Sequence, residues 1–148
     1  MKLKNILLII LALIMCFSVL GCSDKGTEGG DTSSESSALG DAKHHEHIKK
    51  FFSAVGESDF EEAQKLLHPS SKISPKEYFT EKGESLQIDF FTGIEFRRFT
   101  GWATLDLDGK QIVDYNVMLV VEDTRVYGNI GVLDDGDGFG VYVIDLYY

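Results

Sequence analysis

The fold of this chain of 148 residues is decided by the stretch VDYNVMLVV at positions 113–121. Apolar side chains occupy every second position, and Asp114 and Asn116 stand between them. Successive side chains of a strand point to opposite faces of a sheet, so this alternation predicts a strand with one strongly apolar face. Asp108-Gly109, just before the stretch, is typical of a two-residue hairpin turn and predicts an antiparallel partner strand.

Further strands are predicted around this one. Residues 125–133 read as a strand, residues 134–138 as a turn with exposed aspartates, and residues 139–148 as a final strand that is apolar on both faces. Residues 86–107 are expected to contribute two more strands. Together these patterns predict an antiparallel sheet of about four to six strands.

Helical spacing replaces this alternation earlier in the chain. Within positions 43–55 the apolar residues stand three or four positions apart and make one face of a helix: Ile48, Phe51, Phe52 and Val55. Ser58 and Glu61 form a capping-box pattern that predicts a second helix to about His68. Ser74-Pro75 predicts the start of a third, short helix that ends near Gly83. Three N-terminal helices packed on one face of a curved antiparallel sheet make an α+β domain.

The N-terminus is typical of an export signal. Two lysines precede an apolar run at positions 6–20, whose length suits a signal-peptide core and is short for a membrane-spanning helix. The run ends in VLGC at positions 19–22, which resembles the bacterial lipobox. The resemblance implies cleavage between Gly21 and Cys22 and a diacylglyceryl thioether on Cys22. An uncleaved anchor and an ordinary secretory signal are the alternatives.

The segment after Cys22 is expected to be a flexible tether. Positions 23–42 hold eleven Gly, Ser or Thr residues and five acidic ones, so they bury too little apolar surface to offset the entropy of ordering. The chain thus divides into a signal peptide at 1–21, the lipidated Cys22 with its tether at 22–42, and one domain at 43–148. We expect a lipid-anchored protein of the bacterial cell envelope, on the extracytoplasmic side of a membrane, with no cofactor besides the covalent lipid.

The net charge of the chain limits the classes of partner that it can bind. It has 14 Lys and Arg against 24 Asp and Glu, a formal net charge of -10, and no basic block. Nucleic acid is therefore excluded as a partner, because neutralising phosphates needs clustered bases. The acid excess is concentrated in residues 101–148, which hold nine acids and two bases. A solvated sheet surface explains it, and a surface that steers a cationic partner is the alternative.

Three segments of the domain resemble a known family. The segments FFSAVGESDFEEA at 51–63 and LLHP at 66–69 are similar to the opening of NTF2-like lipoprotein domains, and GFGVYVID at 138–145 looks like the last strand of that superfamily, with Phe139 where Trp is common. The resemblance implies a cone-shaped α+β barrel whose sheet wraps around the helices and encloses a pocket or a filled core. NTF2-like enzymes such as ketosteroid isomerases and scytalone dehydratases place Asp, His or Tyr inside this cone.

Aromatic residues either line or fill the space inside such a cone: Phe51, Phe52, Tyr78, Phe79, Trp102, Tyr115 and Tyr142. The candidate pocket residues among them are Phe52, Tyr78, Trp102, Tyr115 and Tyr142, with Trp102 the first choice for a ligand contact. Acid–base chemistry would use residues from another set: Tyr78, Asp114, Tyr115, Asp145 and His68. No pair among these matches a catalytic motif of the family, so no catalytic residue is assigned.

Two clusters have metal-ligand chemistry without the spacing of a metal site. The residues HHEH at 44–47 lack the H-E-x-x-H arrangement, and we expect them to be solvated in the first turn of a helix. The residues DDGDG at 134–138 lack the later ligands of a calcium-binding loop, so we expect a hairpin turn. No metal ligand is assigned.

Three hypotheses for function follow. The first is a non-enzymatic module that binds a small apolar ligand or a protein partner outside the membrane. The second is an NTF2-like enzyme that uses a buried Asp or Tyr as an acid–base group. The third is a structural or inhibitory lipoprotein that acts through its acidic sheet surface.

Overall fold

The computed structural model describes residues 40–148 of the chain. The predicted signal peptide, Cys22 and nearly all of the predicted tether lie outside the described residues, so these predictions stay as they were made. Within residues 40–148, no helix is long and apolar enough to cross a membrane.

Three α-helices and a short 3-10 helix precede the sheet: α3 (Ala42–Gly56), α4 (Phe60–Lys65), α5 (Pro75–Leu86) and η1 (Phe90–Thr92). The first agrees closely with its predicted range, whereas α4 ends before His68. The third helix runs past Gly83, where a Cβ would lie 2.7 Å from the carbonyl oxygen of Ile88. The glycine therefore permits close packing instead of ending the helix, which ends at Leu86 and is capped by Gln87 in the left-handed conformation.

The predicted capping box of α4 is wrong by one residue. Asp59 is the N-cap, and its Oδ1 accepts a hydrogen bond from the amide of Glu62 at 3.0 Å. Ser58 has a φ of 60° and belongs to the turn that joins α3 to α4. The turn after Gly56 thus uses up one more residue than the pattern suggested, and the next side chain able to cap takes the role.

The four strands form one antiparallel sheet in the order β1-β2-β3-β4. They are β1 (Glu95–Leu107), β2 (Lys110–Val121), β3 (Thr124–Asp135) and β4 (Gly138–Tyr147). The prediction of two strands within residues 86–107 is wrong. That segment holds the end of α5, the helix η1 and one long strand, because Asp89 caps η1 through the amide of Phe91.

Two-residue turns connect the strands. Asp108 and Gly109 both have positive φ, at 54° and 75°, which confirms the predicted hairpin turn. Glu122 and Asp123 make the next turn with φ of 49° and 64°, although neither is a glycine. These turns place β1, β2 and β3 side by side in sequence order.

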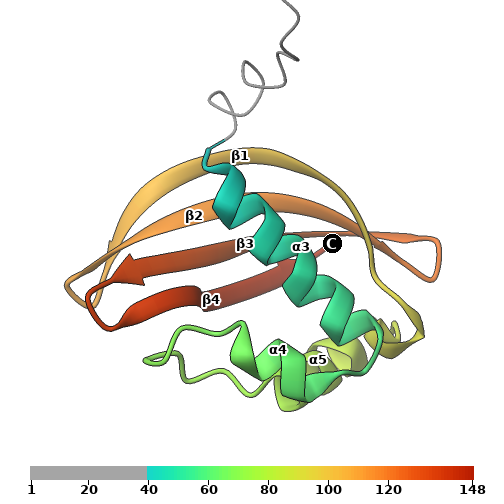
Figure 1. Cartoon of the computed structure of the whole chain (residues 1–148). Coiled ribbons are helices and arrows are strands. Elements are labelled where there is room, and N and C mark those ends of the chain that lie inside the picture. The colour runs from blue at the N-terminus through green and yellow to red at the C-terminus, as the bar shows by residue number, and fades with distance from the viewer. Residues whose placement is uncertain (1–39) are drawn as a thin grey trace, which may run out of the picture. The chain divides into compact units, whose positions relative to one another are not determined.

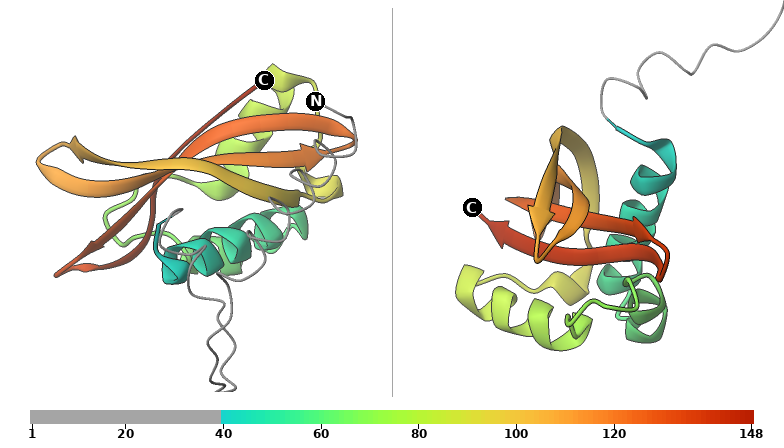
Figure 2. Two further views of the ribbon diagram at one scale, coloured as in Figure 1. Left: turned by 90° about the horizontal axis from the view of Figure 1, so that it is seen from above. Right: turned by 90° about the vertical axis from the view of Figure 1, so that its left-hand side faces the viewer.

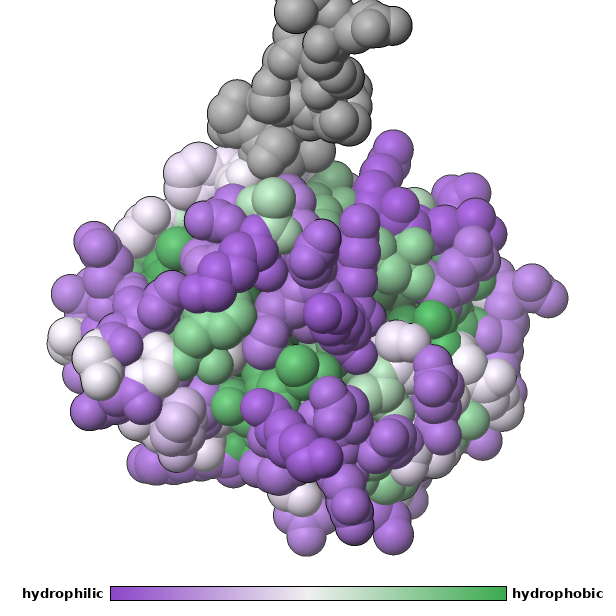
Figure 3. All heavy atoms as spheres, viewed as in Figure 1, coloured by the Kyte–Doolittle hydropathy of each residue, from purple (hydrophilic) through white to green (hydrophobic). Residues whose placement is uncertain are grey.

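The long helix α3 crosses one face of this sheet, as Figure 1 shows. We call that face the inner face, and its residues on β2 are Tyr115, Val117, Leu119 and Val121, all of them buried. They pack with the apolar residues of α3 into one core that also includes Phe79 and Phe90. The exterior of this side is mostly hydrophilic, as Figure 3 shows.

The two edges of the sheet differ. The edge of β4 is covered, since Leu67 bridges to Val141 and the hydroxyl of Tyr78 on α5 accepts a hydrogen bond from the amide of Leu146 at 3.2 Å. The edge of β1 is open and carries two register irregularities. Bulges of this kind reduce pairing between exposed edges. The contacts at β4 place α4 and α5 along that side of the domain, which the two views of Figure 2 also show.

Candidate ligand groove on the outer face

The face of the sheet opposite α3, which we call the outer face, carries a groove of about 330 Å³. Its apolar lining consists of Leu105, Leu107, Ile112 and Val143. Its polar lining consists of Asp106, Asp114, Asn129 and Asp145. All four strands contribute, so the shape of the groove depends on the register of the whole sheet.

A glycine lets two walls of the groove pack closely. Asp114, Gly131 and Val143 form one row across β2, β3 and β4. A Cβ at Gly131 would lie 2.6 Å from Cγ1 of Val143, 2.9 Å from Cδ1 of Ile112 and 3.9 Å from Oδ1 of Asp114. The side chains of Val143 and Ile112 therefore fill the space above the bare backbone of Gly131, which brings these two walls of the groove close to Asp114.

Asp114 lies at the floor of this groove. Its exposed fraction is only 7%, and its side chain makes no hydrogen bond or ion pair with any other of residues 40–148. Every fully enclosed side-chain polar atom of the described part has a partner, so the oxygens of Asp114 must open to the groove. Burial raises the pKa of this carboxyl above its ordinary value.

The other acids of the groove have partners. Asp145 is paired with Lys82 of α5 at 3.1 Å, and Asp106 accepts a hydrogen bond from the amide of Gly109 at 3.2 Å. Asn129 accepts one from the hydroxyl of Tyr147 at 3.4 Å. Asp114 is thus the lining carboxyl whose binding capacity the protein leaves unused.

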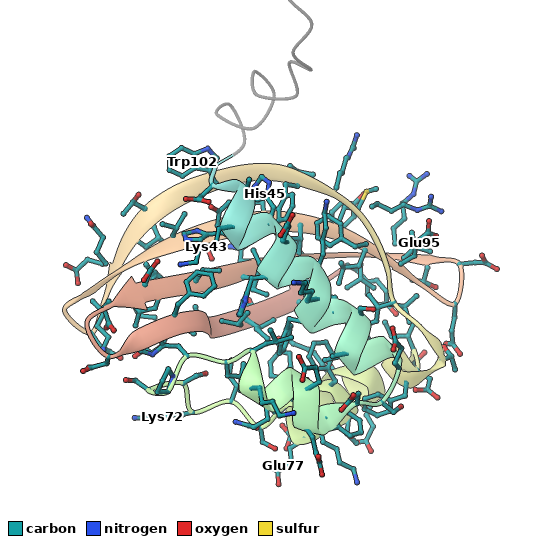
Figure 4. The ribbon with its side chains drawn as sticks, in the orientation of Figure 1. Lys43, His45, Lys72, Glu77, Glu95 and Trp102 are labelled. Atoms are coloured by element: carbon teal, nitrogen blue, oxygen red, sulfur yellow. The ribbon has the colours of Figure 1, made fainter. Side chains whose placement is uncertain are left out.

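The candidate aromatic pocket residues do not line one pocket, although Trp102 is opposite Tyr115 in the pairing of β1 with β2. Phe52 and Tyr115 are fully buried in the core, and Tyr78 packs at the β4 edge. Trp102 is 46% exposed on β1, and Figure 4 shows it pointing outward beyond the first turn of α3. Tyr142 is half-buried near His68, with 6.1 Å between the ring centroids. None of the five lines the outer groove.

The histidines at the start of α3 are packed, which corrects the expectation that they are solvated. His44 is buried, and its Nδ1 lies 2.9 Å from the hydroxyl of Tyr115, which also accepts from the amide of Asp41. Burial lowers the pKa of His44, so the neutral ring is favoured and its Nδ1 can accept the tyrosine proton. His45 stacks on Phe99 with 3.9 Å between ring centroids.

The remaining histidine of this cluster, His47, contacts the carbonyl oxygen of Leu66 through Nε2 at 2.7 Å. It therefore fastens α3 to the end of α4. The cluster stabilises the junction of helix and sheet. Among the described residues, no three His, Cys, Asp or Glu side chains are grouped so that they could hold a metal ion.

The turn at residues 134–138 is more than a solvated loop. Asp135, expected to be exposed, accepts hydrogen bonds from His68 Nε2 at 3.1 Å and from Lys110 Nζ at 3.0 Å. The amide of Ser70 donates to Nδ1 of His68, which leaves Nε2 to donate to Asp135. The hydrogen bond from Lys110, with others from the amide of Asp137 and from His68, lowers the pKa of Asp135 to about 2. These contacts hold the β3–β4 turn against the loop after α4.

The acid–base candidates lie in different parts of the fold. Asp114 and Asp145 both line the groove, whereas Tyr115 is in the core. Burial raises the pKa of Tyr78, whose hydroxyl accepts a hydrogen bond from the amide of Leu146 at the β4 edge. His68 is hydrogen-bonded to Asp135 in the β3–β4 turn.

A second hollow of about 430 Å³ lies between α5 and η1. Its acids, Glu84, Asp89 and Glu122, are exposed, so it lacks the buried carboxyl that distinguishes the outer groove.

Sequence reasoning missed the apolar lining of the groove. Leu105, Leu107 and Val143 look like ordinary strand residues, and nothing local shows which face they share. A signal was present in two interruptions of the strand patterns, the acid at Asp114 and the glycine at Gly131. Combining them requires the register of β2 and β3.

Comparison with known proteins adds one structural likeness. No protein-family model matches the sequence, and no curated protein matches it. Among solved structures, an Ntf2 like protein involved in plasmid conjugation is similar to this chain, with 14% sequence identity and a TM-score of 0.42. The alignment covers 87% of this chain and 49% of that one, so this chain spans about half its length.

Proposed function

We propose that the protein is a lipid-anchored, extracytoplasmic binding module with an NTF2-like domain, and that it takes its ligand on the outer face of the sheet. One observation carries the binding function. Asp114 is buried at the floor of an apolar groove and has no partner within the described part of the chain. A polar group held this way costs stability, and ligand pockets typically combine apolar walls with a few such groups.

The anchoring part of the proposal rests on the sequence. The VLGC stretch at positions 19–22 and the polar segment after it support lipidation of Cys22 outside the cytoplasm. The variant Cys22→Ala should lose labelling by a radioactive fatty acid and leave the membrane fraction. Continued labelling of the variant would refute the anchor without touching the groove.

Photo-crosslinking in native membranes tests the groove. A benzophenone amino acid replaces Leu105, which is 45% exposed and lines the groove, or Thr104, the next residue, which is exposed on the inner face of β1. Adjacent strand residues face opposite sides of the sheet, so position 104 is the neighbour of position 105 in the chain but lies outside the groove. We expect one small-molecule adduct of defined mass at position 105 and its absence at position 104.

A filled groove provides the control. Val143 is half-buried on the groove wall, and Val143→Phe extends its side chain into the hollow. The adduct at position 105 should disappear in this variant. Equal adducts at positions 104 and 105, or an adduct that persists in Val143→Phe, would rule out the groove as the binding site.

A second candidate function is acid–base catalysis at Asp114. Burial raises the pKa of this carboxyl, and raised pKa values are typical of catalytic acids and bases. The compound recovered from the groove decides between the two functions. Binding alone leaves it chemically unchanged, whereas an enzyme converts it in the wild type and loses this conversion in Asp114→Asn.

A further inference from the structure

We infer that the ligand of the outer groove is a small amphiphilic amine, whose ammonium group binds Asp114 and whose apolar body lies along Leu105, Leu107 and Ile112. The inference rests on the proposed function, since it names the ligand class for the same groove. It follows from the sign of the charge, the direction in which Asp114 faces, and the size of the hollow.

The charge of the lining selects a cation. Three carboxyl groups and no basic side chain line the groove. Lys82 reaches the rim of the groove and neutralises Asp145 there, at 3.1 Å. Asp106 is on the β1–β2 hairpin and accepts from the turn amide. Neither contact reaches Asp114, so an anionic ligand would meet an uncompensated carboxylate, and a cation would satisfy it.

The direction of Asp114 selects a ligand that enters the groove. The side chain is more than nine-tenths buried and unpartnered in the described chain, and it lines the outer groove. A donor that reaches it from the groove therefore shares that space with the hydrocarbon of Leu105 and Leu107. A molecule with an ammonium group on an apolar body suits this groove, because the ammonium pairs with the carboxylate of Asp114 and the apolar body packs against the leucine side chains.

The hollow excludes other cations and partners. A volume of about 330 Å³ is that of a small-molecule site. Hard divalent cations take six or more oxygen ligands, and half of this lining is hydrocarbon. A second copy of the chain paired on this face across a two-fold axis would bring the two unpaired Asp114 side chains towards each other without supplying a cation, and this like-charge contact is unfavourable.

The experiment compares two compounds that differ in charge alone. The full chain is anchored in lipid nanodiscs and titrated with 4-(trifluoromethyl)benzylamine or with 4-(trifluoromethyl)benzyl alcohol, and binding is followed by fluorine NMR. Empty nanodiscs report the partition of each compound into lipid. We expect the amine to bind at least about tenfold more tightly than the alcohol, because a hydrogen bond between two charged groups is much stronger than one to a neutral hydroxyl.

Two variants connect this preference to Asp114. In Asp114→Asn the amide keeps the size of the side chain and removes its charge, so the amine should fall to the affinity of the alcohol. The control Asp123→Asn removes the same charge from the exposed turn at the other end of β2 and should leave both affinities unchanged. Circular dichroism confirms that both variants are folded.

The outcomes separate this inference from the proposed function. Equal binding of amine and alcohol, with both lost in Val143→Phe, would overturn the amine and leave the groove as a binding site for neutral compounds. Preference for the amine that survives Asp114→Asn would overturn the role of Asp114. No binding of either compound at millimolar concentration would overturn the inference, and the crosslinking at position 105 would still test the groove.

Discussion

The two faces of the sheet are made by the same strands and have opposite properties. On the inner face, alternate residues of β2 are apolar and fully buried beneath α3. On the outer face the intervening positions include Asp114, and no hydrogen bond or ion pair compensates its burial anywhere in residues 40–148. The difference teaches that stability explains the inner face completely and leaves the outer face unexplained. The binding function that we propose would account for that remainder.

The largest expected effect concerns the inner face. Phe52 is fully buried, with ring contacts to Phe51, Phe79 and Phe96. Phe52→Ala should lower the free energy of unfolding by about 3–5 kcal/mol, because it removes buried apolar surface and leaves a cavity. Leu105→Ala, a truncation on the outer face, should change it by about 0.5 kcal/mol or less. Urea denaturation measures both, and equal losses would contradict the division between the faces.

Two glycines of β3 sharpen the comparison. Gly128 faces the core, where a Cβ would lie 2.7 Å from the carbonyl oxygen of Asp145, whereas Gly131 faces side-chain ends in the groove. Backbone cannot move aside cheaply, so Gly128→Ala should cost about 1–3 kcal/mol of unfolding free energy. Gly131→Ala should cost less and should weaken binding in the groove. Thermal unfolding of both variants checks the order, and the reverse order would refute this assignment.

A smaller effect is expected where the inner face meets the chain before α3. The hydroxyl of Tyr115 contacts Nδ1 of His44 and the amide of Asp41. Tyr115→Phe keeps the buried ring and removes these hydrogen bonds, so we expect a loss of about 1 kcal/mol in unfolding free energy. A double-mutant cycle with His44→Ala should show coupling between the two side chains. Additive effects would mean that the hydrogen bond contributes nothing.

The smallest effects concern the pH dependence of two aspartates. The pKa of Asp135 is held at about 2, chiefly by the hydrogen bond from Lys110, so its contribution to stability is present above its ordinary value of 3.8 and is lost as the pH falls towards 2. Burial raises the pKa of Asp114, so the protonated group favours the folded state at low pH, and this contribution is lost as the pH rises through its folded pKa.

Carboxyl-carbon NMR measures both titrations, and unfolding at neutral pH gives a second check. Asp114 should titrate above 3.8 and Asp135 below it. Asp135→Asn should lower stability at neutral pH, whereas Asp114→Asn should leave it unchanged or raise it. Two titrations near 3.8 would show that the surroundings of the two carboxyls do not differ as the structure indicates.

The sequence by itself determined the class of the domain and the type of nearly every element. Helix spacing in residues 43–55 and alternation in residues 113–121 are local properties, so they predicted α3 and β2 closely. The errors fell where local patterns compete. Ser58 looked like an N-cap because of Glu61, and the chain used Asp59 instead. Residues 86–107 were divided into two strands where one strand follows a 3-10 helix.

Only the tertiary structure decided which aspartate is left without a partner. Asp114 and Asp135 are the same residue type, and each lies in a strand. Asp135 is paired with Lys110 and accepts a hydrogen bond from His68, which are 25 and 67 positions away in the sequence. Asp114 meets Ile112 and Val143 above a glycine and finds no such donor in the described chain. A side chain's partners are set by packing between distant segments, whereas its secondary structure is set largely by its neighbours. The class of the domain could therefore be derived from the sequence, and the candidate site could not.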